Sequence, residues 1–283
     1  MRLAVLTPAP DEPHFAAIAL QGFDRLAAPL RRAGVEAVPR PWTEAGDLSA
    51  FDAVTPLLAW FYHTRPTNWA ALLDRLESEG VRTINPVETL SWNTRKTYLA
   101  ELEAAGAPVV PTLFVDRLTP AAIAAAHARF GDDIIAKPQV SGGSFETVRL
   151  SPGAALADAP AGAAMLQPFM DAVTGEGELS LLYFGGRFSH ALGKVAAAGD
   201  FRVQVQHGGV STRIDAPADA LAAAERVLVA AGRPLTYARI DLIRGPDEVL
   251  RLMELEAIEP DLFLEHSPDD GAAFAAAMVG AIG

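Results

Sequence analysis

The sequence predicts an α/β protein in which an N-terminal parallel layer precedes two α+β regions. The first observation is that short apolar runs alternate with amphipathic helical segments over residues 1–86, which is typical of a parallel sheet covered by helices. The second is a shift to a more strand-like composition from Met165 onward. The third is a hairpin pattern near the C-terminus, in which the apolar runs 237–243 and 249–258 flank a turn-forming Gly-Pro-Asp.

The N-terminal layer contains predicted strands at 3–6, 35–38, 51–58 and 81–84 and predicted helices at 15–32 and 68–79. The helices are expected to end before Gly34 and at Gly80, because glycine readily adopts the conformation that terminates a helix. Neither GxGxxG after the first strand nor GxxxxGK[ST] anywhere in the chain is present. This layer is therefore not expected to bind a nucleotide in the manner of a Rossmann or P-loop domain.

Two further regions follow, so that the predicted domains are 1–86, 87–164 and 165–283. Thr119 as N-cap and Pro120 at the first helical position begin the clearest helix of the second region. The elements predicted for the second region are helices at 87–105 and 119–130 and strands at 134–138 and 145–150. Those predicted for the third region are strands at 165–170, 178–184, 187–194 and 201–206, a helix at 217–231, the hairpin, and a terminal helix at 269–282.

Composition disfavours several classes of protein. The formal net charge of −12 argues against nucleic acid or an anionic membrane as the main partner, because both require basic patches. No stretch reaches the roughly twenty apolar residues of a membrane span, and the N-terminal apolar run is too short for a signal peptide. Cysteine is absent, which removes disulfides and thiolate metal sites together. We expect a cytoplasmic protein.

Four charged side chains are predicted to share one face of the C-terminal hairpin. Because side chains alternate along a strand, Arg239 and Asp241 face the same way, and a loop of even length brings Glu254 and Glu256 to that side. Three converging carboxylates repel one another and are costly to desolvate without a cation. Mg²⁺ suits them, because it binds carboxylate oxygens and leaves positions for phosphate oxygens. The alternative is an amphipathic hairpin with a solvated acidic face.

A loop of small residues after Lys137 forms the second candidate site. Residues 138–144 read PQVSGGS, and their glycines permit a close backbone approach in which successive N–H groups surround an anion. Lys137 adds a positive charge for a phosphate. The alternative is an ordinary glycine-rich turn beside an exposed lysine.

Taken in order, Lys96, Lys137 with its loop, the segment QPFM at 167–170, Glu178 and the carboxylates of the hairpin resemble the ATP-grasp superfamily. The resemblance covers roughly residues 85–260 and looks closest to the branch of glutathione synthetase and D-alanine–D-alanine ligase. Within it, NPVETLSWNTRKTYLAELEAAGAPVVPT and MELEAIEPDLFL resemble the group of the cycloserine-forming cyclo-ligase. The fold that this implies is an N-terminal α/β domain followed by a two-lobed α+β ATP-grasp fold.

The resemblance implies a role for each matching residue. The implied ATP contacts are Lys96 and Lys137 on the phosphates, Ser141, Gly142, Gly143 and Ser144 in the loop closing over them, Gln167, Phe169 and Met170 on adenine, and Glu178 on the ribose. The implied ligands of one or two Mg²⁺ ions, or of Mn²⁺, are Asp241, Glu254 and Glu256. Arg239 would stabilise the transferred phosphoryl group, and Arg202 would reach the substrate or the γ-phosphate. The family usually has Asn at the position of Glu256, which leaves the number of metal ions open.

The activity implied by the resemblance is that of an ATP-dependent ligase. It would activate a carboxylate or ureido oxygen of a small amino-acid-like substrate as a phosphorylated intermediate, which an amine then displaces to form a C–N bond. The alternatives are an intramolecular cyclo-ligase of the cycloserine-forming type and a nucleotide-binding regulatory protein without catalysis. A homodimer is common among related ligases, although no sequence feature here indicates one. For His14, His63, His207 and the aromatic run 60–63, a structural role and a role in acceptor binding both stay open.

Overall fold

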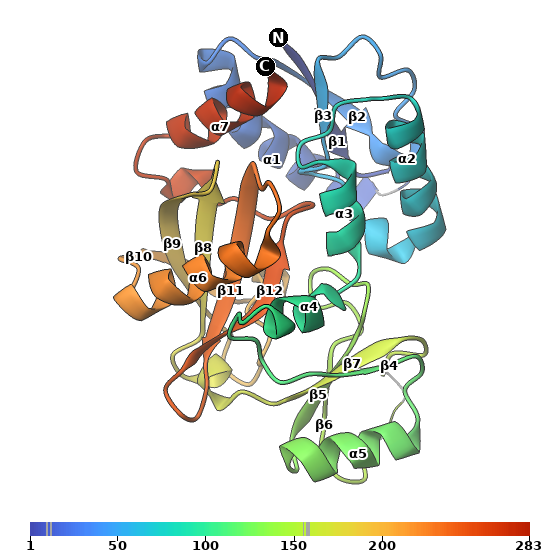
Figure 1. Cartoon of the computed structure of the whole chain (residues 1–283), viewed down its shortest axis with the longest axis vertical. Helices are drawn as coiled ribbons and strands as arrows, with labels where there is room; N and C mark the ends of the chain where they lie inside the picture. The colour runs from blue at the N-terminus through green and yellow to red at the C-terminus, as the bar shows by residue number, and fades with distance from the viewer. Residues whose placement is uncertain (10, 12, 155, 157–158) are drawn as a thin grey trace.

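The computed structural model describes residues 1–9, 11, 13–154, 156 and 159–283, and the side chain of His14 lies outside this description. Three sheets follow one another along the long axis of the molecule (Figure 1). Their strand orders are β2-β1-β3, β10-β9-β8-β11-β12 and β4-β7-β5-β6. The predicted α/β architecture is confirmed, with a parallel first sheet and two antiparallel ones.

The N-terminal sheet is parallel, as its alternating pattern predicts. It consists of β1 (Arg2–Thr7), β2 (Glu36–Pro41) and β3 (Ala53–Thr55), with α1 (Pro13–Arg32) and α2 (Pro66–Ser78) packed beside it. The predicted strand at 81–84 is wrong, because this segment forms only a single bridge between Val54 and Thr83. The C-terminal helix α7 (Ala272–Ile282) contacts α1 and brings both chain termini to this end of the molecule (Figure 1).

The helix predicted over 87–105 is wrong in one respect, since it is broken around Lys96. The structure has α3 (Val87–Thr94) and α4 (Tyr98–Ala104), and Arg95 between them is extended, with φ −113° and ψ 122°. The backbone N–H of Lys96 donates instead to the carbonyl of Gln139, at 2.7 Å. This contact binds the break to the segment after β5 (Ile134–Pro138) and places Lys96 beside the predicted phosphate loop.

The smallest sheet is antiparallel and is covered by α5 (Pro120–Phe130). Thr119 caps this helix as predicted, since its hydroxyl accepts from the N–H of Ala122 at 3.1 Å. The strands of this sheet are β4 (Leu113–Val115), β5, β6 (Val148–Leu150) and β7 (Ala164–Pro168). The domain limits at 86 and 164 stay a prediction, and β7, which begins at the second of them, pairs within this sheet.

The largest sheet carries the hairpin. Its strands are β8 (Glu178–Phe184), β9 (Arg187–Val195), β10 (Val210–Ile214), β11 (Tyr237–Arg244) and β12 (Leu250–Glu256). One face is buried under α4 and the alanine-rich α6 (Ala218–Ala231), whose small side chains allow close packing on β8 and β12. The strand predicted at 201–206 is wrong, because this segment contains no strand and leads into the short helix η4 (Val205–His207), while β10 follows it.

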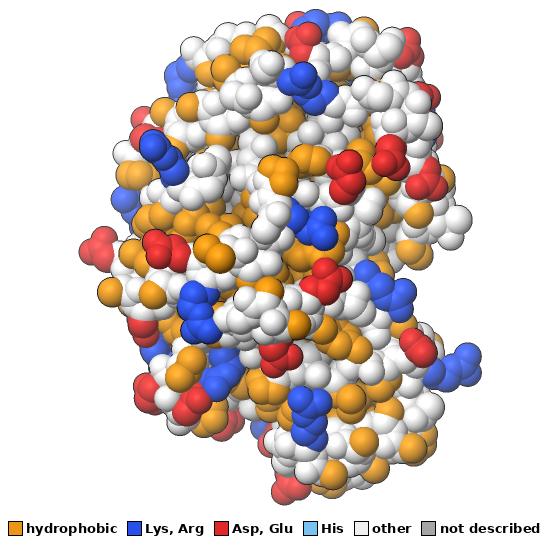
Figure 2. Space-filling model, in the orientation of Figure 1, with side chains coloured by type: hydrophobic (Ala, Val, Ile, Leu, Met, Phe, Trp, Pro, Cys, Tyr) orange, Lys and Arg blue, Asp and Glu red, His pale blue; other side chains and the backbone are white. Residues whose placement is uncertain are grey.

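The remaining short helices are η1 (Trp42–Glu44), η2 (Tyr62–Thr64), η3 (Asp171–Thr174) and η5 (Leu264–His266). On the face drawn in Figure 2, basic side chains are scattered among acidic and apolar ones. None of the helices in the described part of the chain is both long enough and apolar enough to span a bilayer.

Candidate active site

The charged residues of the hairpin share one face, as predicted. In the antiparallel pair of β11 and β12, Arg239 lies opposite Glu256 and Asp241 lies opposite Glu254. The expected loop of even length is wrong, because residues 245–249 separate Arg244 from Leu250, and the register shift between Asp241 and Leu242 restores the two pairings. The expected placement of the three carboxylates and Arg239 on one face is confirmed.

The outer edge of β12 is held by side chains from outside the sheet. Asn93 on α3 donates to the carbonyl of Leu255 at 2.8 Å and accepts from the N–H of Ala257 at 2.8 Å. The hydroxyl of Tyr98 donates to the same Leu255 carbonyl at 2.9 Å and accepts from its N–H at 3.0 Å. Because these bonds complete the edge of the strand, they fix the positions of Glu254 and Glu256 on its other side.

All three lysines of the chain lie in this site. Lys96, Lys137 and Lys194 are 5%, 9% and 6% exposed, although lysine is seldom buried without an ionic partner. Lys96 pairs with Glu254 and also donates to the carbonyl of Ser141 at 2.9 Å. Every other Lys or Arg charge in the sequence is an arginine, so lysine is confined to one cluster.

Lys194 stands on β9 directly opposite Glu178 on β8. Its Nζ lies 3.1 Å from a Glu178 carboxylate oxygen and 3.4 Å from Asp241 Oδ1. Burial by itself would lower the pKa of Lys194, but Asp241 and Glu178 raise it above its ordinary value. Lys194 is thus a fully charged centre of the site, and Glu178 is engaged in an ion pair rather than free.

Arg239 connects the two strands of the hairpin. Its Nη2 donates to Asp241 Oδ2 at 2.9 Å and its Nε to Asp241 Oδ1 at 3.0 Å, and Nη2 also pairs with Glu256. The Ser180 hydroxyl donates to Asp241 as well. Although burial opposes ionisation of Asp241, Arg239 and Lys194 hold its pKa well below the ordinary value.

Glu256 is less well compensated. Burial raises the pKa of Glu256 to about 7. Arg239 lowers this pKa, but Glu254 and Asp241 raise it and offset part of the effect of Arg239. This carboxylate occupies the position at which the ATP-grasp pattern has a neutral Asn. The cations of the cluster therefore compensate Glu256 less than they compensate Asp241.

Two charged groups of the cluster form no ion pair within the described part of the chain. Lys137 on β5 is buried near Lys96 and Glu254, and burial lowers the pKa of its ammonium group. Glu259, which sequence reasoning missed, lies three residues beyond β12, and its pKa is raised well above the ordinary value, first by burial and then by Glu256. An uncompensated buried charge is costly, so both groups are positioned for ligands of opposite charge.

The loop of residues 141–144 contacts Lys96 on one side and the segment before β10 on the other. Ser144 donates to the side-chain carbonyl of Gln204 at 2.7 Å, and Gln206 donates to the carbonyl of Gly143 at 3.3 Å. Gly143 and Ser144 both have positive φ, 58° and 63°, which strains the serine. The segment preceding β10, in which sequence reasoning expected a strand, thus fastens the predicted phosphate loop.

The predicted adenine contacts gather at the end of β7. Gln167 is 4% exposed, and its amide donates to the Thr112 hydroxyl at 2.9 Å, which fixes the orientation of the amide. Met170 belongs to an apolar cluster with Val203 and Ile243, and Phe169 lies against that cluster. An apolar surface beside an oriented amide suits a planar heteroaromatic ring.

Two predicted residues lie apart from the ionic cluster. Arg202 forms a two-pronged pair with Asp200, with its Nη2 2.8 Å from Oδ2 and its Nε 3.0 Å from Oδ1. His207 is the last residue of η4. Neither forms a hydrogen bond or ion pair to the hairpin among the described residues, so their roles at the site stay predictions.

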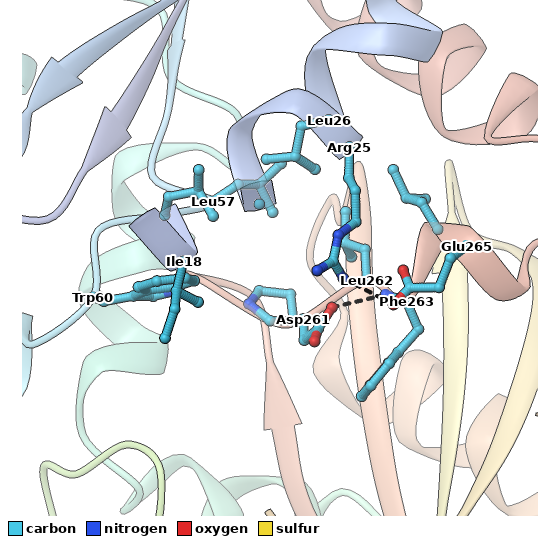
Figure 3. Close-up of a pocket in the computed structure, with 13 residues that line it drawn as sticks. Ile18, Arg25, Leu26, Leu57, Trp60, Asp261, Leu262, Phe263 and Glu265 are labelled. Atoms are coloured by element: carbon cyan, nitrogen blue, oxygen red, sulfur yellow. Dashed lines mark hydrogen bonds and ion pairs between the residues drawn. The ribbon is translucent and has the colours of Figure 1, made fainter. Parts of the chain in front are cut away.

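A cavity of about 140 Å³ adjoins the hairpin (Figure 3). It lies between α1, the segment after β3 and the segment after β12, and Arg25 points toward Asp261 and Glu265 from one wall. Arg239 reaches the same segment, since its Nη1 lies 3.4 Å from the carbonyl of Asp261. Trp60 lines the cavity, whereas Tyr62 is buried in the N-terminal core, and the role of the aromatic run in acceptor binding stays a prediction.

Comparisons with known proteins fit this geometry. The model of the N-terminal domain of the D-cycloserine synthetase DcsG matches residues 4–85. The cycloserine biosynthesis protein DcsG of Streptomyces lavendulae is 31% identical over 273 residues, which is 88% of this chain and 89% of that protein. The chain belongs to the ATP-grasp ligases, in the group of DcsG. It is therefore an ATP-dependent enzyme of the kind that forms C–N bonds and releases ADP.

Solved ATP-grasp structures share its fold. The crystal structure of D-cycloserine synthetase DcsG matches with a TM-score of 0.86 at 28% identity, and the match covers 100% of both chains. The D-alanine–D-alanine ligase of Bacillus anthracis, solved in complex with ATP, matches with a TM-score of 0.72 at 16% identity and covers 100% of this chain and 97% of that one. The second match shows the fold alone.

The carboxylate oxygens of the hairpin are the donor type that a hard metal ion prefers, but in this structure they are not arranged around a common point. Among the described residues, no three Asp, Glu or His side chains are arranged as a metal cage. The reason is that the oxygens of Asp241, Glu254 and Glu256 face Arg239, Lys96 and Lys194. Excess carboxylate charge and all-oxygen donors nevertheless fit Mg²⁺, which would complete the neutralisation that the lysines and Arg239 begin.

Proposed function

We propose that this ATP-grasp ligase is an intramolecular cyclo-ligase acting on a small amino-acid-like molecule. A carboxylate oxygen of the substrate attacks the γ-phosphorus of ATP, and ADP leaves. A nitrogen of the same molecule then attacks the carbonyl carbon and loses a proton, and phosphate departs with the former carboxylate oxygen. The product is a cyclic amide, and each turnover consumes one ATP.

The observation that carries the proposal is that the similarity to D-cycloserine synthetase extends over both the ATP site and the N-terminal domain. The cavity beside Arg239 is built from that N-terminal domain and the segment after β12. Its volume of about 140 Å³ corresponds to about five water molecules, which suits a small metabolite better than a peptide.

The residues of the site divide the work as follows. Lys137, which has no ion-pair partner among the described residues, contacts the phosphates together with Lys96, and the loop of residues 141–144 closes over them. Arg239 stabilises the charge that develops on the transferred phosphoryl group. Asp241, Glu254 and Glu256 would hold Mg²⁺, which would supply positive charge to offset that of the phosphates.

Adenine lies against Met170 and Phe169 with its edge at the Gln167 amide. Glu178 and Lys194 lie beside the ribose. They form an ion pair from neighbouring strands of the same sheet. The reaction needs no nucleophilic Ser or Cys, because positioning and charge stabilisation suffice for phosphoryl transfer. We further propose that the protein acts in the cytoplasm. A homodimer stays a prediction.

An ADP-release screen over amino acids, dipeptides and ureido amino acids, followed by mass spectrometry, tests the proposal. The expected product of a hit is one substrate molecule less the elements of one water. A product containing two substrate molecules would establish intermolecular ligation instead. Lys137→Met should reduce ADP release by about two to three orders of magnitude, because it removes a phosphate contact. Lys137→Arg, which keeps the charge, should retain more of the activity.

A further inference from the structure

The segment after β12 forms one wall of the cavity, and its backbone is held by side chains of the large sheet. Residues 260–265 line the cavity, and the first four of them lie outside any helix or strand (Figure 3). Three consecutive carbonyls, those of Asp261, Leu262 and Phe263, accept hydrogen bonds from side chains of the sheet. The position of this irregular wall therefore depends on the side chains that donate to it.

The two donors stand in one row across the sheet. Arg239 on β11 pairs with Leu182 on β8, which pairs in turn with His190 on β9. Because directly opposite residues of neighbouring strands point to the same face, Arg239 and His190 both face the segment. Nη1 of Arg239 lies 3.4 Å from the carbonyl of Asp261, and Nε2 of His190 lies 3.1 Å from each of the two carbonyls that follow. The arginine of the hairpin and His190 thus hold the same stretch of backbone.

A β-bulge immediately precedes His190 on β9. Leu182 pairs with His190, whereas the next residue, Tyr183, pairs with Phe188, so Ser189 is the extra residue of the bulge. Bulges of this kind redirect side chains and are common beside active sites. The side chain that the bulge presents is 3% exposed and has no contact with bulk solvent to replace its bonds to the segment.

His190 donates from Nε2. Carbonyl oxygens only accept, so Nε2 carries a proton in both contacts with the segment. Nδ1 lies 3.0 Å from the hydroxyl of Ser189, which donates to it when the ring is neutral. Burial lowers the pKa of His190, which keeps the ring neutral near pH 7. Ser189 and the two carbonyls together fix both the tautomer and the orientation of the ring.

Phe263 connects the held backbone to Arg239. Its φ of 46° and ψ of 43° lie in the left-handed region, which a bulky residue adopts only where its surroundings impose it. Its carbonyl is bonded to His190, and its ring centroid lies 6.0 Å from the guanidinium carbon of Arg239. Loss of the bonds from His190 would let Phe263 relax and would displace the cavity wall from Arg239.

We propose that His190 is a positioning residue that fixes the cavity wall relative to Arg239 and thereby aligns the small-molecule substrate with the phosphoryl group of ATP. The inference rests on the proposed function, in which the cavity holds that substrate and Arg239 stabilises the transferred group. His190 is not among the residues that line the cavity, so it acts through the carbonyls of the segment. A misplacement of about 1 Å can slow a reaction about 100-fold, so a displaced wall should impair turnover without impairing ATP binding.

The test replaces His190 in the full-length enzyme. His190→Leu removes the donor, whereas His190→Gln offers an amide N–H of similar reach and is the matched control. The probes are MgATP with whichever amino acid or ureido amino acid gives the greatest ADP release in the wild type, and a non-hydrolysable ATP analogue. His190→Leu should lower kcat/KM for the small-molecule substrate at least about tenfold and leave the Kd of the analogue within about twofold. His190→Gln should keep kcat/KM within about threefold of the wild type, because the hydrogen bonds are restored.

Ser189→Ala is a second variant that removes the hydroxyl orienting the ring and leaves His190 in place. It should lower kcat/KM about threefold with little change in Tm, and it decides the matter if His190→Leu does not fold. Unchanged kcat/KM in the deciding variant would overturn the inference. So would equal losses in His190→Leu and His190→Gln, or an equal loss of affinity for the ATP analogue. These three results leave the proposed function intact, whereas a wild type that releases no ADP with any probe would overturn the proposed function and the inference with it.

Discussion

The substitutions Asp241→Asn and Glu254→Gln should separate the structural from the catalytic contribution of the hairpin. The two carboxylates lie directly opposite one another on β11 and β12. Asp241 is embedded in an ionic network, with its side chain 6% exposed and contacts to Arg239, Lys194 and Ser180. Glu254 is 26% exposed and has one charged partner, Lys96.

The expected cost in stability differs between the two. Removing one member of a buried ion pair costs about 3–5 kcal/mol, since the remaining charges lose their compensation. Asp241→Asn should therefore lower Tm by on the order of 10 °C in a chain of this size. Glu254→Gln should cost only about 1 kcal/mol, because the pair is partly solvated and Lys96 keeps its hydrogen bond to the Ser141 carbonyl.

Both variants should lose ADP release by at least about two orders of magnitude, since each removes a metal ligand. The assay is ADP release at a temperature well below both midpoints, combined with calorimetric unfolding. If Glu254→Gln unfolds as early as Asp241→Asn, the hairpin is mainly a structural element. If it keeps its full ADP release, the acidic face does not hold the catalytic metal.

Three further outcomes follow from the contacts. Asn85→Ala removes a fully buried amide that bonds to the carbonyls of Tyr237 and Ala257 at 3.0 and 2.9 Å and should destabilise the fold by about 3 kcal/mol in denaturant titrations; unchanged stability would contradict this. Thr112→Val frees the Gln167 amide and should raise KM for ATP several-fold with little change in Tm, whereas an unchanged KM would argue against an adenine contact. Folding lowers the pKa of His63 from 6.5 to about 4, so between these pH values the unfolded chain binds one proton more than the folded chain, and the free energy of unfolding should fall as pH drops from 6.5 to 4. In pH-dependent unfolding, His63→Gln should remove this part of the fall. An identical fall in the variant would refute the role of His63.

The face of the hairpin was predictable only in part. Strict alternation fixes which side chains of each strand lie together, so Arg239 shares a face with Asp241 and Glu254 shares one with Glu256. The register between the strands was not predictable, because the loop of residues 245–249 has an odd length and the shift between Asp241 and Leu242 brings Asp241 opposite Glu254 and Arg239 opposite Glu256. Local pattern therefore gave the two acidic faces, and the register shift joins them.

Features set by distant contacts were not predictable. Nothing between Val87 and Ala105 signals a helix break, which arises because the Lys96 backbone bonds to Gln139. The position of Lys194 in the site could not be predicted, because it depends on the pairing of β9 with β8, which places it opposite Glu178. Glu259 lies beyond the alternating pattern of β12, and only the three-dimensional structure places it opposite His63.

One sequence signal could have strengthened the analysis. The chain has only three lysines, and all of them lie in the site. All other residues of the Lys and Arg total are arginines, so the few lysines are distinguished by where they lie. In a chain so poor in lysine, a lysine before a small-residue loop is a stronger indicator of a phosphate contact than it is in an average sequence.

The central claim is that a substrate carboxylate receives the γ-phosphoryl group of ATP at the site under the 141–144 loop. The most direct test uses a substrate whose carboxylate carries a heavy oxygen isotope, incubated with MgATP and the full-length enzyme, with mass analysis of the released phosphate. Phosphate that acquires one labelled oxygen per ADP formed is the predicted result, because the oxygen leaves with phosphorus when the C–N bond forms. Phosphate free of label, in the presence of steady ring formation, would contradict the claim.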